Sequence, residues 1–212
     1  MSDTFRVPAG TGESELTEKR SRFLGHLRKV ETEEDAKMFI STIKKQFHDA
    51  RHNCWCYRIH DVTERFSDDG EPSGSAGMPM LEVFRREDVF NFVCVVTRYF
   101  GGVLLGTGGL SRAYSSAAKL ALTDAGLLLL GRQRKLSVQC PYAFVERLKS
   151  FLMSAGAEIT DQTYGAYVAL TLLVPEAKAE ELSVQITDLS NGKAQTVIGE
   201  SVYESTGDAG KP

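Results

Sequence analysis

The chain lacks any apolar run long enough to cross a membrane. A membrane-spanning helix needs about 20 mostly apolar residues, and no segment of that kind occurs in the 212 residues. The N-terminal stretch MSDTFRVPAGTGESE is polar and has none of the apolar core of a secretory signal. The sequence therefore predicts a cytoplasmic protein without a membrane partner.

Cysteine is also scarce. The four cysteines are scattered, and three of them lie inside or beside apolar segments: Cys54, Cys56, Cys94 and Cys140. A disulfide framework in a secreted domain is denser than this. We therefore expect reduced, buried thiols.

A zinc site is an alternative for two of these cysteines, because His48 and His52 precede Cys54 and Cys56 closely. Residues 52, 54 and 56 would share one face of a strand. However, Cys-Trp-Cys lacks the two-residue gap of zinc knuckles, and no second ligand cluster follows. The sequence thus favours neither a metal nor a cofactor.

No excess of positive charge is present, since the formal net charge is −3. Positive and negative side chains balance up to Arg132, so the remainder of the chain carries the whole net charge. This charge argues against strong nonspecific nucleic-acid binding by the whole molecule. Local basic density at residues 19–29 and 44–65 leaves the first part as the better candidate for a phosphate-binding surface.

The first part of the chain alternates between strand and helix patterns. After a loose arm over residues 1–14, we expect a strand at 21–30 and a helix that Thr32 caps and that runs to Phe47. Further strands are predicted at 53–60 and, fully apolar and central, at 89–98. Between them lie a polar loop at 61–73 and a short helix within 74–86, and an alanine-rich helix is expected at 111–125.

The pattern restarts after a predicted linker at residues 126–134. Strands are expected at 136–140, 157–163, 167–174 and 194–202, with helices at 142–155 and 176–189. The order βαββαβ is that of a ferredoxin-like unit. We therefore predict an α+β protein with domains at 1–130 and 131–205 and a disordered tail at 206–212.

A glycine-dense loop joins the central strand to the alanine-rich helix. It contains five glycines followed by a serine and an arginine: Gly101, Gly102, Gly106, Gly108, Gly109, Ser111 and Arg112. Such clusters mark backbone that takes positive φ or approaches another group closely. Free N–H groups at the helix start, framed by Arg98 and Arg112, predict a site for phosphate. The alternative is a tight crossover in which these arginines pair with nearby carboxylates.

An acidic turn precedes the short helix and holds Asp68, Asp69, Glu71 and Ser73. Three carboxylates beside a phosphate site are suited to Mg²⁺. The other interpretation is structural, with an aspartate forming the turn and Ser73 or Ser75 capping the next helix. We favour the structural interpretation.

The motifs RYFGG, LGTGGL and SDDGEP-SG-SAG, together with KRSRF at 19–23 and ARHNC at 50–54, resemble the signature of the YigZ/IMPACT family, also called UPF0029. The resemblance covers roughly six-tenths of the chain. It implies an N-terminal domain like domain 2 of ribosomal protein S5, followed by a ferredoxin-like domain similar to a module of elongation factor G. This is the bacterial YigZ-type layout, without the RWD domain of eukaryotic relatives. The family's Ala-x-His motif includes His52, which we add to the candidate anion-binding residues.

Two functions remain open. The resemblance implies a noncatalytic regulatory protein linked to translation, with RNA, a ribosome-associated factor or another protein as partner, because eukaryotic relatives act on starvation signalling to initiation. The alternative is an enzyme that acts on a phosphorylated small molecule or nucleotide through the glycine loop. No hydrolase motif and no P-loop lysine is present, so no catalytic residue is predicted. Four aromatic residues are suited either to base stacking or to the core: Trp55, Tyr57, Tyr99 and Phe100.

Overall fold

The computed structural model describes residues 4–210, the last four by their backbone alone. The chain divides into two compact units, one of Gly131–Ser205 and the other of Thr4–Leu130 with the residues from Thr206 on. Each unit contains both sheet and helices, as expected for an α+β protein, and each has its own apolar core. Among the residues described, no helix is long and apolar enough to span a membrane.

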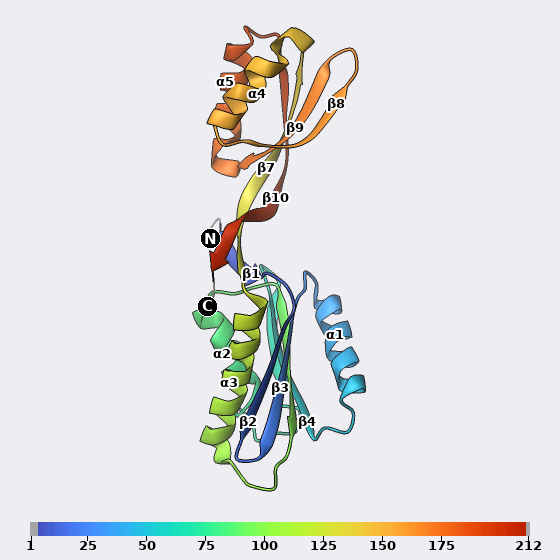
Figure 1. Cartoon of the computed structure of the whole chain (residues 1–212), viewed down its shortest axis with the longest axis vertical. Coiled ribbons are helices and arrows are strands. Elements are labelled where there is room, and N and C mark those ends of the chain that lie inside the picture. The colour runs from blue at the N-terminus through green and yellow to red at the C-terminus, as the bar shows by residue number, and fades with distance from the viewer. Residues whose placement is uncertain (1–3, 211–212) are drawn as a thin grey trace. The chain divides into compact units, whose positions relative to one another are not determined.

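The N-terminal unit is built on an antiparallel sheet. Its strands lie in the order β2 (Gly12–Glu18), β3 (Ser21–Lys29), β6 (Phe92–Tyr99), β4 (His52–Ile59) and β5 (Thr63–Ser67). Helices α2 (Gly77–Arg86) and α3 (Gly106–Ala125) cover one face, and α1 (Glu33–Gln46) lies on the other (Figure 1). The central position predicted for the apolar strand is confirmed, because β6 pairs with β3 and β4.

Alternation along β4 supplies both cores of this unit. Cys54 and Cys56 pack beneath α2 and α3, whereas Trp55 and Tyr57 pack toward α1. All four cysteines are free and buried, as predicted. The predicted cap of α1 is also confirmed, since the Thr32 hydroxyl accepts a hydrogen bond from the backbone N–H of Asp35.

The C-terminal unit has the element order predicted for it. It comprises most of β7 (Leu127–Cys140), α4 (Val145–Ser154), β8 (Glu158–Tyr164), β9 (Val168–Pro175), α5 (Ala179–Leu189) and most of β10 (Gln195–Gly210). Single 3₁₀ turns, Tyr142–Phe144 and Glu176–Lys178, precede the two helices. β7 pairs with β9, β10 and β1 (Thr4–Pro8), and β8 pairs with β9.

Four segments predicted to be irregular are strands. The expected arm at 1–14 contains β1 and the start of β2, although residues 1–3 lie outside the described residues. The predicted linker at 126–134 falls almost wholly within β7, and the polar loop at 61–73 contains β5. β10 continues to Gly210 through the segment expected to be disordered, whose residues 211–212 are not described. β2 and β5 are edge strands with a single buried residue between them, so burial leaves little alternation to detect. In β7 the run of four leucines at 127–130 shows no alternation either, although Leu127 and Leu130 are buried.

The glycine loop is shorter than predicted, because α3 begins at Gly106 and not at residue 111. Gly102 and Gly106 have positive φ angles of 83° and 71°. Gly101 approaches the Arg20 backbone so closely that an added Cβ would lie 2.0 Å from a carbonyl carbon. Gly108 is helical, and an added Cβ there would meet only the Arg112 side chain at 3.7 Å, so a special role for this glycine is wrong.

Alanine substitutions at Gly101 and Gly108 should have opposite effects on stability. Gly101→Ala should destabilise the protein by about 1–3 kcal/mol, because the methyl group would collide with rigid backbone. Gly108→Ala should instead stabilise α3 by up to about 1 kcal/mol, since alanine is the better helix former. Urea denaturation of both variants checks this, and equal destabilisation would contradict the different roles assigned to them.

A half-buried histidine makes the stability of the protein depend on pH. His26 of β3 stacks on Phe47 with ring centroids 4.9 Å apart, and its buried Nε2 has no hydrogen-bond partner among the described residues. Burial lowers the pKa of His26 below its usual 6.5, although Glu13 opposes the shift. The unfolded chain therefore binds this proton more readily than the folded chain.

The histidine's contribution to stability should be present above pH 6.5 and lost as the pH falls through that value toward the lower folded pKa. The neutral variant His26→Gln should lose less stability than the wild type between pH 7.5 and 5.5. Urea midpoints at both pH values measure this, and parallel losses in the two proteins would assign the acid sensitivity to other groups.

Candidate functional site

A hollow of about 370 Å³ lies where β4 begins, β6 ends and α3 begins. Its walls come from the turn before β4, the acidic turn, the glycine loop and the first turn of α3: Arg51, His52, Gly70, Glu71, Pro72, Arg98, Phe100, Leu104, Leu105, Gly106, Thr107 and Leu110. Three segments far apart in sequence thus meet at one end of the sheet. Cationic, aromatic and apolar groups share the hollow with helix amides.

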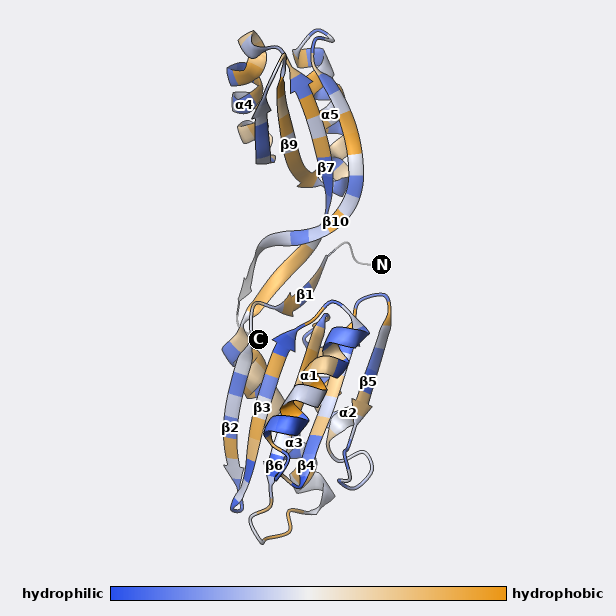
Figure 2. Ribbon diagram, turned by 90° about the vertical axis from the view of Figure 1, so that its right-hand side faces the viewer, coloured by the Kyte–Doolittle hydropathy of each residue, from blue (hydrophilic) through white to orange (hydrophobic). Residues whose placement is uncertain are grey.

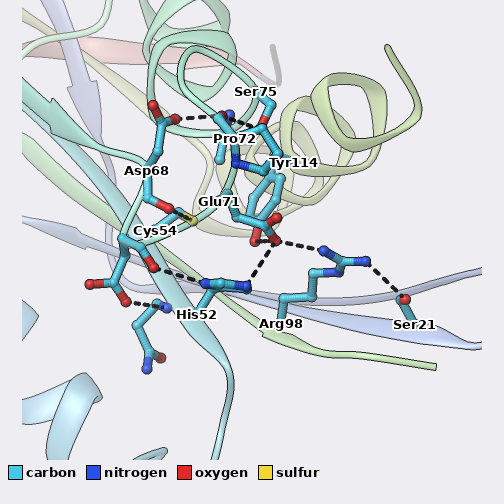
Figure 3. A network of polar contacts seen from close by, with 12 residues as sticks. Ser21, His52, Cys54, Asp68, Glu71, Pro72, Ser75, Arg98 and Tyr114 are labelled. Atoms are coloured by element: carbon cyan, nitrogen blue, oxygen red, sulfur yellow. Dashed lines mark hydrogen bonds and ion pairs between the residues drawn. The ribbon is translucent and has the colours of Figure 1, made fainter. Parts of the chain in front are cut away.

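The inner wall of the hollow contains a buried carboxylate, Glu71, to which neighbouring side chains are hydrogen-bonded. Its Oε1 accepts hydrogen bonds from Arg98 Nη1 at 2.7 Å and from the Tyr114 hydroxyl at 2.8 Å (Figure 3). The Glu71 and Arg98 side chains are only 3% and 7% exposed. A buried charge of either sign is costly without its partner. The pair therefore ties the acidic turn to β6, and Tyr114 ties both to α3.

His52 belongs to the same cluster, and a hydrogen bond to the backbone fixes the orientation of its ring. Its Nδ1 lies 2.8 Å from the carbonyl oxygen of Asp69, and a carbonyl only accepts, so Nδ1 is the donor. Its Nε2 then faces Glu71 Oε1 at 3.9 Å (Figure 3). The ring is mostly buried and borders the hollow, so it is oriented by the protein and not by solvent.

Arg98 retains capacity for a further contact. Its Nη2 reaches the Ser21 hydroxyl at 3.4 Å, and its buried Nε has no partner within the described chain. The guanidinium lies between Phe23 and Phe100, 5.5 and 5.6 Å from the two ring centroids. Arg51 stands over the same Phe100 ring at 5.7 Å. The half-exposed Phe100 thus sits between two arginines.

The acidic turn is occupied by internal contacts. Asp68 accepts from the backbone N–H groups of Gly74, Ala76 and Gly77, so this carboxylate caps α2. The capping predicted for Ser73 or Ser75 is therefore wrong: Ser73 is exposed, and the Ser75 hydroxyl donates to the Pro72 carbonyl.

Asp69 is engaged as well, by the Lys44 ammonium and the Asn53 backbone N–H. Together with Asp68 and Glu71, every carboxylate of the turn has strong partners within the protein. Among the described residues no group of three histidine, cysteine, aspartate or glutamate side chains is placed to hold a metal ion. The acidic turn therefore has a structural role: its carboxylates connect it to α1, β4, α2 and β6.

Two further polar groups lie under the hollow. Burial raises the pKa of the Cys54 thiol to about 12, and its Sγ donates to the Asp68 carbonyl. Burial also raises the pKa of Tyr114 above its usual range, with Cys54 and Glu71 adding to the shift. Both groups stay protonated near neutral pH, so neither is a nucleophile.

The hollow gathers only part of the residues predicted for it. Arg98, His52, Glu71 and Gly106 border it, and Gly101 is taken up by packing on Arg20. Gly109 and Arg112 border a separate hollow with Glu18 and Lys19, so the two arginines do not frame one rim as expected. Gly102, Gly108, Ser111, Asp68, Asp69 and Ser73 do not border the hollow either.

Arg51 was not predicted as a site residue, and for Phe100 the sequence left both base stacking and the core open. Both border the hollow, and neither is buried. The signal for Arg51 was its place beside His52 in the motif Ala50-Arg51-His52. Trp55 and Tyr57, by contrast, pack against the α1 core, and the Tyr99 hydroxyl donates to Asp49.

Comparisons with known proteins bear on this arrangement. Residues 19–122 match the Impact N-terminal domain, and residues 138–193 match a domain of unknown function, DUF1949. The chain is 38% identical over 205 residues to the IMPACT family member YvyE of Bacillus subtilis, covering 96% of this chain and 94% of that protein. The chain belongs to the IMPACT family. The site described here therefore lies in the Impact N-terminal domain.

Other relatives extend the likeness. The IMPACT family member YigZ of Escherichia coli is 37% identical over 186 residues, which cover 84% of this chain and 89% of YigZ. The protein IMPACT homolog of Dictyostelium discoideum matches over 45% of this chain and 29% of its own length, at 35% identity. A crystal structure described as that of a hypothetical protein covers 93% of this chain and 98% of its own, with 32% identity and a TM-score of 0.62.

The buried ion pair should matter for stability. Arg98→Ala leaves the Glu71 carboxylate buried without its cation and should destabilise the protein by about 3–5 kcal/mol. Tyr114→Phe removes one hydrogen bond to the same oxygen and should cost about 1–3 kcal/mol.

Arg112→Ala is the matched control, because Arg112 forms no ion pair among the described residues; its effect should stay within about 0.5 kcal/mol. Guanidinium denaturation of the three variants measures the order. An Arg98→Ala protein as stable as the Arg112→Ala protein would show that the pair contributes nothing.

Proposed function

We propose that this protein is a noncatalytic binding protein linked to translation and that it holds RNA at the hollow between β4, β6 and α3. The observation that carries the proposal is the grouping at the mouth of the hollow. Arg51 stands over the half-exposed Phe100 ring, beside the first amides of α3. A phosphate and a base are the two parts of a nucleotide that such a grouping suits.

The phosphate would contact Arg51 and the start of α3. Gly106 and Thr107 border the hollow, and no side chain among residues 4–206 caps the N-terminus of this 20-residue helix. Helix N-termini with unpaired N–H groups favour anions. Arg98 adds a buried Nε without a partner in the described chain, although its charge is already balanced by Glu71.

A base would stack on Phe100, with apolar contact from the loop that follows it. Phe100 is 41% exposed and Leu104 is 83% exposed, so both are available to a ligand. Stacking on an aromatic ring tolerates any base. We therefore propose a site for single-stranded RNA with little sequence preference.

The alternative, an enzyme that acts on a phosphorylated substrate, rests on the oriented His52 ring beside Glu71. Phosphoryl transfer also needs a metal ion or equivalent positive charge on the leaving group. The carboxylates of the acidic turn are engaged with backbone N–H groups, Lys44, Arg98 and Tyr114. The binding function is therefore the better supported of the two.

The link to translation comes from the family resemblance, in which eukaryotic relatives act on signalling to initiation. The finer fold assignments belong to the same proposal: an S5 domain-2-like N-terminal unit and a ferredoxin-like C-terminal unit. The second is supported by the strand neighbours, with β7 between β10 and β9, and β8 beside β9. A cytoplasmic location would accord with the four free thiols.

Binding of a fluorescein-labelled uridine octamer, followed by anisotropy, tests the proposal. Arg51→Ala should weaken affinity about tenfold and flatten the salt dependence by about one phosphate contact. Phe100→Ala should weaken it by about 1–3 kcal/mol through lost stacking. Both residues are accessible, so neither variant should disturb the fold.

Arg112→Ala is the matched control, since it removes the same charge from the neighbouring hollow and should leave affinity unchanged. Equal weakening by Arg51→Ala and Arg112→Ala would mean a diffuse electrostatic effect and not a site. No octamer binding at low salt would refute the proposed function.

A further inference from the structure

A second surface of the N-terminal unit lies on the opposite face of the sheet. We call it the α1 groove, a hollow of about 500 Å³ between α1 and β4, lined by Lys37, Ile40, Ser41, Lys44, Lys45, His48, Trp55 and Tyr57. α1 packs over β4 and β6 and leaves the edge strand β5 to one side (Figure 2).

The floor of the groove is aromatic. Trp55 and Tyr57 project from the same face of β4 and stack nearly parallel, with ring centroids 5.6 Å apart and planes 9° apart. Tyr57 is buried and holds Glu33 through its hydroxyl, whereas Trp55 remains partly exposed. A partly exposed indole that is stacked on a second ring is a suitable platform for a base.

The charges of the groove are unevenly distributed along α1. Its first turn carries Glu33 and Glu34, and its last turn carries Lys44 and Lys45, with His48 just beyond. Glu33 also binds Lys37, and Asp69 binds Lys44.

Lys45 has no ion pair within the described residues. The exposed Arg65 lies opposite Tyr57 on β5, and Tyr57 bonds Glu33, so Arg65 belongs to the other end of the groove. The end of the groove near His48 is consequently its cationic end, and a phosphate there would add no carboxylate repulsion from α1's first turn.

The cationic end leads toward the first hollow. His48 borders the groove, and Arg51, three residues later in the same turn, borders the hollow of the proposed RNA site. A backbone hydrogen bond from Ala50 to Phe47 keeps this turn compact. One extended strand of nucleotides could therefore contact both surfaces.

We propose that the α1 groove is a second contact surface for single-stranded RNA, with a base on Trp55 and phosphates on Lys45 and His48. The inference rests on the proposed function, because it extends the same RNA from Arg51 onto α1. An acidic protein segment would satisfy the cations, but its carboxylates would not stack on the indole, whereas every nucleotide carries both a phosphate and a planar base.

The chain's single tryptophan reports on this surface directly. Titration with an unlabelled uridine octamer should quench Trp55 emission, because a stacked base quenches indole, and the quenching should weaken with salt. Lys45→Ala should reduce the affinity severalfold, and the double variant Lys45→Ala, His48→Ala should reduce it further. Lys193→Ala, an exposed lysine of the C-terminal unit, is the matched control and should change nothing.

The outcomes distinguish the two sites. Quenching that persists in Arg51→Ala but is lost in Lys45→Ala would support the groove as an RNA site and refute the hollow as one. Octamer binding seen by anisotropy, without quenching and without an effect of Lys45→Ala, would overturn the groove and leave the hollow intact. Quenching by polyglutamate but not by the octamer would assign the surface to an acidic protein and overturn the RNA inference.

Discussion

The buried ion pair between Glu71 and Arg98 is the constraint on which the N-terminal unit depends. Glu71 comes from a turn, Arg98 from the central strand, and Tyr114, which binds the same oxygen, from α3. The three groups position the acidic turn over one end of the sheet and hold the start of β4 beside it through His52. Because each charge would be costly alone, the cluster forms completely or not at all. The hollow is the space that remains in front of it.

The regular interior of the fold could be predicted from the sequence, because its elements bury one face and show it in their periodicity. The Thr32 cap, α1, β4 and the apolar β6 are examples. Two strands that were missed, β2 and β5, lie at the edges of the sheet and have a single fully buried residue between them. The start of α3 was not predicted because it contains three glycines, which have no side chains and add no periodic pattern.

The sequence predicted where the candidate site lies, but not that Arg112 would point away from it or that Glu71 would be the partner of Arg98. Helical phase explains the error over Arg112. With α3 starting at Gly106, Gly106 and Leu110 lie four residues apart on the side of the hollow, and Arg112 is rotated by about 200° from Leu110. The carboxylate that pairs with Arg98 could not be predicted for a different reason. Glu71 is 27 residues away, and only the tertiary fold decides between that carboxylate and its neighbours Asp68 and Asp69.

The capping of α2 by Asp68 has a consequence for how this region opens. One carboxylate binds Gly74 in the turn and both Ala76 and Gly77 at the helix start. The turn therefore cannot loosen while the first turn of the helix stays protected, and the helix cannot fray while the turn stays closed. The amide protons of these three residues should therefore exchange together, as one local opening unit centred on a side chain that contributes nothing to the apolar core.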